Sequence, residues 1–305
     1  MEILTRTPLF IRRLSVVCLY CIFILSLSTS MVFASTEEST PIDIASYLSD
    51  EEAVFSVFYL RPDNTPRNAY IYNSKPMRSA SMIKVFIYGF AMQQVKEGTI
   101  SLTEPFVLSE KDMVGGAGVL TGYEVGTVLS FQELLELMII ESDNTATNIV
   151  IDRLGMDKIN EYISSNGYED TILQRKMMDF HAAEQGYENY TSVSDLGLFY
   201  TRLYDYQCVD KDYDAMMIDI LKQQQDTEAL PAAFPYDVVA HKTGELIGVY
   251  NDGGIIYGKD NRIIVILTDD YQNREKTIDK IIDLSRYLDN FYSNSGDELE
   301  KGISL

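Results

Sequence analysis

Apolar and polar residues alternate in two short segments near the start of the chain and in three segments after residue 238. The early pair is "AVFSVFYL" (53–60) and "NAYIYN" (68–73), joined by the turn-rich "RPDNTPR". The late three are "VVAHKTG", "LIGVYNDGGIIYG" and "RIIVILTDD". A period of two is typical of strands. We therefore expect an early hairpin and three late strands.

The section between these strands follows a helical pattern instead. Ser130 and Glu133 form a capping box at the start of "FQELLELMII". Further helices are expected in "TATNIVIDRLG", "MDKINEYISSNG", "SDLGLFYTRLYD" and "YDAMMIDILKQQQ", and one from Ser81 to about Val95. The amphipathic segment "REKTIDKIIDLSRYLDNFY" predicts a last helix near the end of the chain.

The early and late strands are expected to share one antiparallel sheet that the last helix covers, with the helical section inserted between them. This arrangement predicts an α/β domain from residues 38–78 and 232–293, a helical domain at 79–231 and a polar tail at 294–305. With 305 residues, 46% of them hydrophobic, the chain can bury a full core.

Residues 1–34 are predicted to be an export signal. Three arginines precede an uncharged run from Leu14 to Ala34, which ends in "VFA". An uncleaved membrane anchor is the alternative, because the run is nearly long enough to span a bilayer. We therefore expect a secreted protein, or one at the extracytoplasmic cell surface, that contacts a membrane only through this segment.

Composition narrows the class of partner. Cleavage would remove Cys18 and Cys21 and leave Cys208, so no internal disulfide is expected. The net charge of −21 argues against nucleic acid, whose phosphates need basic patches. No His, Asp and Glu cluster has the spacing of metal ligands, and nothing calls for an organic cofactor. We expect a monomer whose partner is a small molecule.

Three short motifs carry candidate chemistry. Ser81 and Lys84 are three residues apart in "SASMIK", so they share a helix face, where a lysine can activate a serine nucleophile. Alone, this pattern also fits a helix start with a solvated lysine. "ESDNTATN" then places Ser-Asp-Asn at 142–144 between helices, and "HKTGE" places Lys-Thr-Gly at 242–244 on a strand. In this order and spacing the three motifs form the signature of penicillin-recognising serine enzymes.

On these motifs the chain resembles class A serine β-lactamases, from about Ser56 to Leu288. The stretches "VLSFQELLELMIIESDNTATNIVIDRLG" and "VVAHKTGELIGVYNDGGIIY" take part in the resemblance. It implies an α/β domain, whose five-stranded antiparallel sheet is flanked by helices, beside an all-helical domain, with the active site between them. It also implies a serine hydrolase that opens β-lactam amides through an acyl-enzyme.

The resemblance implies a catalytic role for three residues. Ser81 would attack the carbonyl from the start of a helix, whose dipole favours developing negative charge. Lys84 would accept the proton if burial and the neighbouring Lys242 lower its pKa. Ser142 would pass a proton to the departing nitrogen.

Five further residues are implied in substrate binding. Asn144 would hold the lysine and a substrate amide, and Lys242 and Thr243 would receive the substrate carboxylate. Gly244 would let the backbone come close to the substrate. The backbone N–H of Glu245, with that of the nucleophile, would form the oxyanion hole.

One position departs from the family pattern where deacylation depends on it. Class A enzymes carry a glutamate after Arg-x in a loop between the second and third motifs. Here Arg175 matches, but Met177 stands at the glutamate position, and a thioether cannot accept the proton of the attacking water. Asp179, His181 or Glu184 are the substitutes that the loop offers. Asp179 is the first choice, although it could instead pair with Arg175 and pin the loop.

Glu245 is a second departure, because the family usually has a small residue there. Its carboxylate would repel the carboxylate of a β-lactam and favour a neutral or amine-bearing substrate.

Two further functions therefore stay open. One is a cell-wall amidase or esterase like the D,D-peptidases, with poor β-lactam turnover. The other is a non-catalytic protein that binds peptidoglycan or antibiotic. The presence of only His181 and His241, and of no Gly-x-Ser-x-Gly motif, argues against a Ser-His-Asp mechanism.

Overall fold

The fold is described from a computed structural model that covers residues 43–301. The predicted export signal, with Cys18 and Cys21, lies outside these residues. Between residues 43 and 301, no helix combines the length and the apolar composition needed to cross a bilayer.

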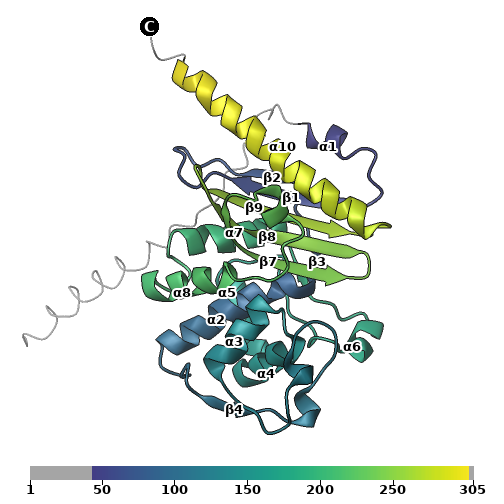
Figure 1. The fold of residues 1–305 in the computed structure, drawn as a ribbon, viewed down its shortest axis with the longest axis vertical. Helices are drawn as coiled ribbons and strands as arrows, with labels where there is room; N and C mark the ends of the chain where they lie inside the picture. The colour runs from purple at the N-terminus through teal and green to yellow at the C-terminus, as the bar shows by residue number, and fades with distance from the viewer. Residues whose placement is uncertain (1–42, 302–305) are drawn as a thin grey trace, which may run out of the picture. The chain divides into compact units, whose positions relative to one another are not determined.

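A five-stranded antiparallel sheet joins the two ends of the described chain. Its order is β2-β1-β9-β8-β7, so the early hairpin lies beside the late strands, with Val57 of β1 opposite Ile266 of β9 (Figure 1). The strands are β1 (Val54–Leu60), β2 (Tyr70–Tyr72), β7 (Val238–Leu246), β8 (Val249–Tyr257) and β9 (Arg262–Asp269). The predicted sheet is therefore confirmed.

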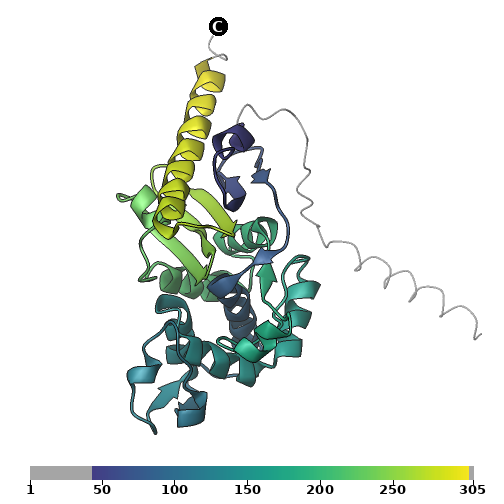
Figure 2. The same cartoon turned by 90° about the vertical axis from the view of Figure 1, so that its right-hand side faces the viewer.

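Each face of the sheet is buried by a different set of helices. The side chains of Phe55, Val57 and Tyr59 in β1 join a core with α10 (Arg274–Lys301), while Phe58 and Leu60 join the core of the helical section. Figures 1 and 2 show α10 lying along its face of the sheet. The short helices α1 (Ile44–Tyr47) and α9 (Leu230–Ala233) add to the α10 side. The alternation that predicted these strands thus separates two cores.

On the other face, α7 (Val193–Tyr204) packs directly against β1. A Cβ at Gly197 in α7 would meet the ring of Phe58 at 2.4 Å, so the helix can lie this close only because the residue is glycine.

The inserted section is mostly helical, as predicted. Its helices are α2 (Lys84–Lys96), α3 (Phe131–Ile140), α4 (Asn144–Leu154), α5 (Met156–Ser165), α6 (Phe180–Glu184), α7 (Val193–Tyr204) and α8 (Lys211–Leu221). The capping box at the start of α3 is present, because Ser130 and Glu133 each accept from the other's backbone N–H. The domain boundaries given above stay a prediction.

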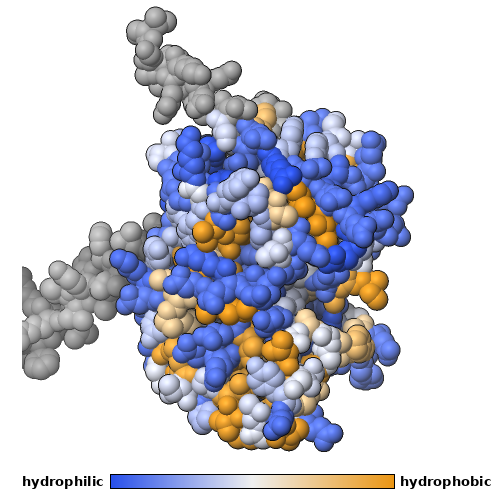
Figure 3. Space-filling view, in the orientation of Figure 1, coloured by the Kyte–Doolittle hydropathy of each residue, from blue (hydrophilic) through white to orange (hydrophobic). Residues whose placement is uncertain are grey.

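Short elements complete the section. They are the 3₁₀ turns η1 (Ala80–Ile83), η2 (Glu110–Asp112) and η3 (Leu120–Gly122), and the strand pairs β3 (Met77–Arg78) with β6 (Tyr190–Thr191) and β4 (Pro105–Val107) with β5 (Val128–Ser130). On the face shown in Figure 3, hydrophilic side chains dominate, and apolar residues gather at the lower end, near β4.

Candidate active site

Ser81 lies in the turn η1, and Lys84 is the first residue of α2. The predicted helix start at Ser81 is therefore a 3₁₀ turn instead. The residue before it, Ala80, has a φ of +47°, a left-handed conformation that is strained for a residue with a Cβ. Ser81 lines a cavity of about 160 Å³, and its hydroxyl makes no hydrogen bond to another described residue. Its oxygen is thus available to a substrate.

Lys84 is fully buried among acceptors. Its Nζ lies 2.6 Å from the carbonyl oxygen of Ser142, 3.1 Å from Ser142 Oγ and 3.1 Å from Asn144 Oδ1. Burial, helped by the positive charge of Lys242, lowers the pKa of Lys84 well below its ordinary value, although Asp143 opposes the shift. A neutral amine has two hydrogens for the two carbonyl-type oxygens and keeps one lone pair. Lys84 is therefore suited to accept a proton.

Ser142 connects two lysines that are far apart in the sequence. Lys242 Nζ donates to Ser142 Oγ at 3.0 Å and to the carbonyl of Thr243 at 2.8 Å. Burial lowers the pKa of Lys242 to about 7, against the opposing pull of Asp226 and Asp252. A hydroxyl between two amines, each within hydrogen-bond distance, can take a proton from one side and give one to the other. We call the group Lys84, Ser142 and Lys242 the proton chain.

The turn at 142–144 is held rigidly by its aspartate. Asp143 caps α4 by accepting from Ala146 N at 2.8 Å, and its other oxygen accepts from the backbone N–H groups of Val119 and Leu120. Because Asp143 takes the cap, the amide of Asn144 reaches Lys84 and the carbonyl of Gly115 instead. The positive φ of Ser142, +52°, adds local strain at the point where the hydroxyl meets both lysines.

Strand β7 passes close beside the nucleophile. A Cβ at Gly244 would lie 2.9 Å from Ser79 O and 3.0 Å from Ser81 N, so only glycine lets the two backbones approach this closely. Glu245, the next residue, lines the same cavity as Ser81. This proximity is what the predicted oxyanion hole requires. Thr243 is buried and is not among the described residues that line this cavity.

The opposite wall of the cavity is the loop that carries Met177. Met177 and Phe180 line the cavity, and the backbone of Met177 is clamped by Asn148, which accepts from its N–H at 2.8 Å and donates to its carbonyl at 3.0 Å. Arg175 makes two hydrogen bonds, of 3.0 and 2.9 Å, to the carboxylate of Glu188. The loop is therefore held in place, with Met177 among the residues that line the nucleophile's cavity.

The three substitutes suggested for the missing glutamate do not line this cavity. Asp179 caps α6 by accepting from Ala182 N, and His181 pairs with Gln185 on the exposed side. Glu184 is exposed as well. The alternative that Asp179 pins the loop by pairing with Arg175 is wrong, because Arg175 takes Glu188. The N-cap hydrogen bond to Ala182 N directs the Asp179 carboxylate to the start of α6.

Glu245 is paired, contrary to the expectation that its charge is directed at the substrate. Arg274, at the start of α10, donates to both oxygens of Glu245, at 2.7 and 3.1 Å, and also binds Glu228. Arg274 thus brings one positive charge to the two negative charges of Glu228 and Glu245 at this edge of the cleft. The repulsion of a substrate carboxylate predicted for Glu245 is therefore reduced but not reversed.

Sequence reasoning missed Asn148, Glu188 and Arg274, which pair across distances that no short motif encodes. It also missed a buried pair behind the proton chain, in which His241 Nδ1 lies 2.8 Å from Asp252 Oδ1. Asn148 carried the one available signal, because it lies four residues after Asn144 and so shares its helix face.

Comparison with known proteins agrees with this geometry. The sequence model of the β-lactamase enzyme family matches residues 42–292. The chain is 20% identical to β-lactamase VEB-1 of Pseudomonas aeruginosa over 289 residues, 89% of this chain and 96% of that protein.

Two solved structures share the fold. A β-lactamase from Sphaerobacter thermophilus has a TM-score of 0.72 and 26% identity, covering 80% of this chain and 92% of its own. A mutant of PBP-A, solved as an acyl-enzyme complex with penicillin-G, has a TM-score of 0.76 and 23% identity, covering 82% of this chain and 95% of its own. The chain therefore belongs to the β-lactamase enzyme family and is a serine hydrolase of the acyl-enzyme type.

Proposed function

We propose that β-lactams acylate this protein at Ser81 and that the acyl-enzyme is hydrolysed slowly. Ser81 Oγ bonds to the lactam carbonyl carbon while its proton passes to the neutral amine of Lys84. The C–N bond then breaks, and Ser142 gives its proton to the nitrogen and takes one from a lysine of the proton chain. The observation that carries this proposal is the fully buried Lys84, whose Nζ lies 3.1 Å from Ser142 Oγ, three residues along the chain from Ser81, whose hydroxyl has no partner among the described residues.

Slow hydrolysis is expected because no unpaired carboxylate lines the cavity in the described part of the chain. Among the described residues, the carboxylates that line it are Glu188 and Glu245, and each is paired with an arginine. General base catalysis contributes about a hundred- to ten-thousandfold to such a step. The mutant of PBP-A solved with penicillin-G, a protein of the same fold, is a precedent for an acyl-enzyme that lasts long enough to be observed.

A D,D-peptidase-like action on cell-wall peptides is the second candidate, and Met177 is the observation that favours it. A protein for which β-lactams are only inhibitors has no need for a base that hydrolyses the acyl-enzyme. An export signal at residues 1–34 would bring the protein to the cell wall, and fractionation of cells that express the full chain tests this placement.

The test combines intact-mass spectrometry with a hydrolysis assay. The protein is mixed with penicillin-G, and the Ser81→Ala variant serves as control. We expect a penicilloyl adduct on the wild type and none on Ser81→Ala. An adduct that survives the substitution would contradict the assignment of the nucleophile. Release of D-alanine from a peptide ending in D-Ala-D-Ala would support the second candidate.

A further inference from the structure

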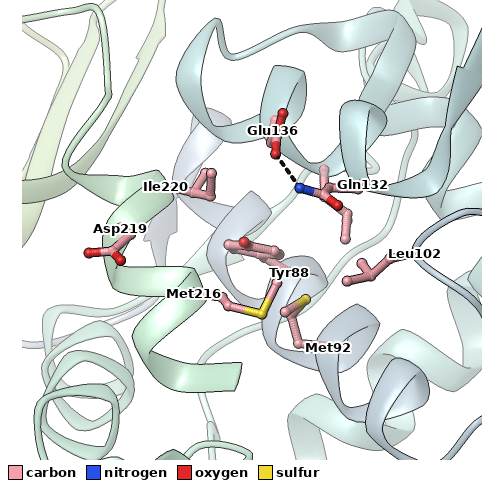
Figure 4. Close-up of a pocket in the computed structure, with 9 residues that line it drawn as sticks. Tyr88, Met92, Leu102, Gln132, Glu136, Met216, Asp219 and Ile220 are labelled. Atoms are coloured by element: carbon pink, nitrogen blue, oxygen red, sulfur yellow. Dashed lines mark hydrogen bonds between the residues drawn. The ribbon is translucent and has the colours of Figure 1, made fainter. Parts of the chain in front are cut away.

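A second cavity, apart from the active-site cleft, lies in the helical section between α2, α3 and α8. Its volume is about 200 Å³. Its apolar lining consists of Met92, Leu102, Leu135, Met216 and Ile220. Figure 4 shows Met92 and Met216 on the same side of Tyr88. A cavity of about 150 Å³ with a comparable lining holds one benzene ring, so this one has room for a ring and a short chain. Methionine side chains adapt their shape to such a ligand.

Tyr88 lies at the centre of this cavity with an unused hydroxyl. Figure 4 shows its ring between Glu136 and Gln132 on one side and Met92 and Met216 on the other. The residue is 4% exposed, and its hydroxyl makes no hydrogen bond to any other described residue. Burial raises the pKa of Tyr88, so the phenol is neutral and offers both a donor and an acceptor. The hydroxyl oxygen is accessible from the cavity, so a ligand bound there can replace water as its hydrogen-bond partner.

The rim of the cavity is negatively charged. Glu136 receives a hydrogen bond of 2.8 Å from the neutral Gln132, which leaves its charge uncompensated. Asp219, on the other side, is paired with Lys222 at 2.9 Å. The lining itself contains no cationic side chain. An apolar lining, a central hydroxyl and an uncompensated carboxylate together match a ligand with one hydrophobic ring and one ammonium group.

We propose that this cavity binds a small primary amine with one aromatic ring. The ring packs against Met92, Leu135 and Ile220. The ammonium group donates to the hydroxyl oxygen of Tyr88 and to the carboxylate of Glu136. The site is independent of acylation at Ser81, because none of its residues belongs to the proton chain or lines the active-site cleft.

Isothermal titration calorimetry of the full chain with 2-phenylethylamine tests the proposal. We expect saturable binding with a dissociation constant of about 1 mM, as suits so small a ligand. The acid of the same size, 3-phenylpropanoate, should not bind, because the rim repels it. Saturable binding of the acid with equal affinity, or no binding of the amine, would overturn the proposal.

Two variants locate the binding site. Tyr88→Phe removes one oxygen and keeps the ring, and Glu136→Gln removes one charge, and each should weaken binding of the amine about fivefold or more. Glu275→Gln makes the same charge change on the exposed first turn of α10 and should leave binding unchanged. Equal affinity in wild type, Tyr88→Phe and Glu136→Gln would mean that the amine binds elsewhere and would contradict the assignment.

Discussion

The two walls of the active-site cleft differ in what they can do with a proton. On the wall formed by η1, the 142–144 turn and β7, Lys84 is buried against Ser142, and Ser142 against Lys242. On the wall formed by the Met177 loop, every carboxylate of the lining is paired. Both walls are well ordered, because the loop has its own clamps in Asn148 and the Arg175–Glu188 pair. The difference is therefore one of chemistry and not of folding.

This contrast separates the two halves of an acyl-enzyme cycle. Forming the ester needs a base for the serine and an acid for the leaving nitrogen, and the first wall has candidates for both. Breaking the ester needs a base for water, which the second wall does not supply. The proposed function is therefore that of a chain that keeps the fold and the acylating groups of its family and turns over slowly.

Replacing Lys84 should have the largest effect. Lys84→Met keeps the volume but removes the amine, so acylation by penicillin-G should slow by about a thousandfold. Stopped-flow or mass-based acylation rates measure this. Lys276→Met, which removes an exposed lysine of α10, is the control and should react like the wild type. An unchanged rate in Lys84→Met would mean that another group activates the serine.

Restoring a carboxylate to the loop should have the next largest effect. Met177→Glu should speed loss of the penicilloyl group by about a hundredfold, because residue 177 is among those that line the cavity. Met177→Gln is the matched control, since an amide of the same length cannot accept the proton. If Met177→Glu and Met177→Gln lose the adduct at the same rate, the polarity of the side chain at 177, and not its basicity, limits deacylation, which would contradict the assigned role of a base.

Local patterns in the sequence predicted the strands and the capping box at Ser130. The resemblance to class A β-lactamases, and not a local pattern, predicted that the three motifs meet, as Lys84, Ser142 and Lys242 do. The pairing of Glu245 with Arg274 depends on a return of the chain through β8 and β9, which no local pattern encodes. Asp179 was misjudged for a related reason. A carboxylate in a loop can cap a helix, bind an arginine or face a cavity. Only the folded conformation of the loop determines which of these it does.

The pH dependence should distinguish substrates with and without a carboxylate, by about tenfold. Lys242 is positive below its pKa of about 7 and loses that charge as the pH rises above it. The predicted role of Lys242 in receiving the substrate carboxylate implies that acylation by penicillin-G falls above pH 7, because the carboxylate then loses its ammonium partner. The methyl ester of penicillin-G should show no such fall. The two pH profiles are measured from acylation rates, and parallel profiles would contradict this role of Lys242.

Removing the charge of Glu245 should have the smallest effect. In Glu245→Gln, Arg274 keeps only Glu228 as a carboxylate partner, so the edge of the cleft becomes more positive. Acylation by penicillin-G should rise about threefold, as for a partly exposed charge, and that by its methyl ester should not change. Glu275→Gln, on the same helix as Arg274, controls for net charge. An equal rise with both substrates would point to the oxyanion hole and not to the carboxylate.

The central claim is that the residues of η1, the 142–144 turn and β7 carry out acylation, whereas the Met177 loop supplies no base for hydrolysis of the acyl-enzyme. A chase experiment tests it most directly: the protein is acylated with penicillin-G, free drug is removed, and the mass of the intact protein is followed. We predict an adduct whose loss is about a hundredfold or more slower than its formation. An adduct lost as fast as it forms would contradict the account, because it would require a deacylating base in a cleft whose carboxylates are all paired.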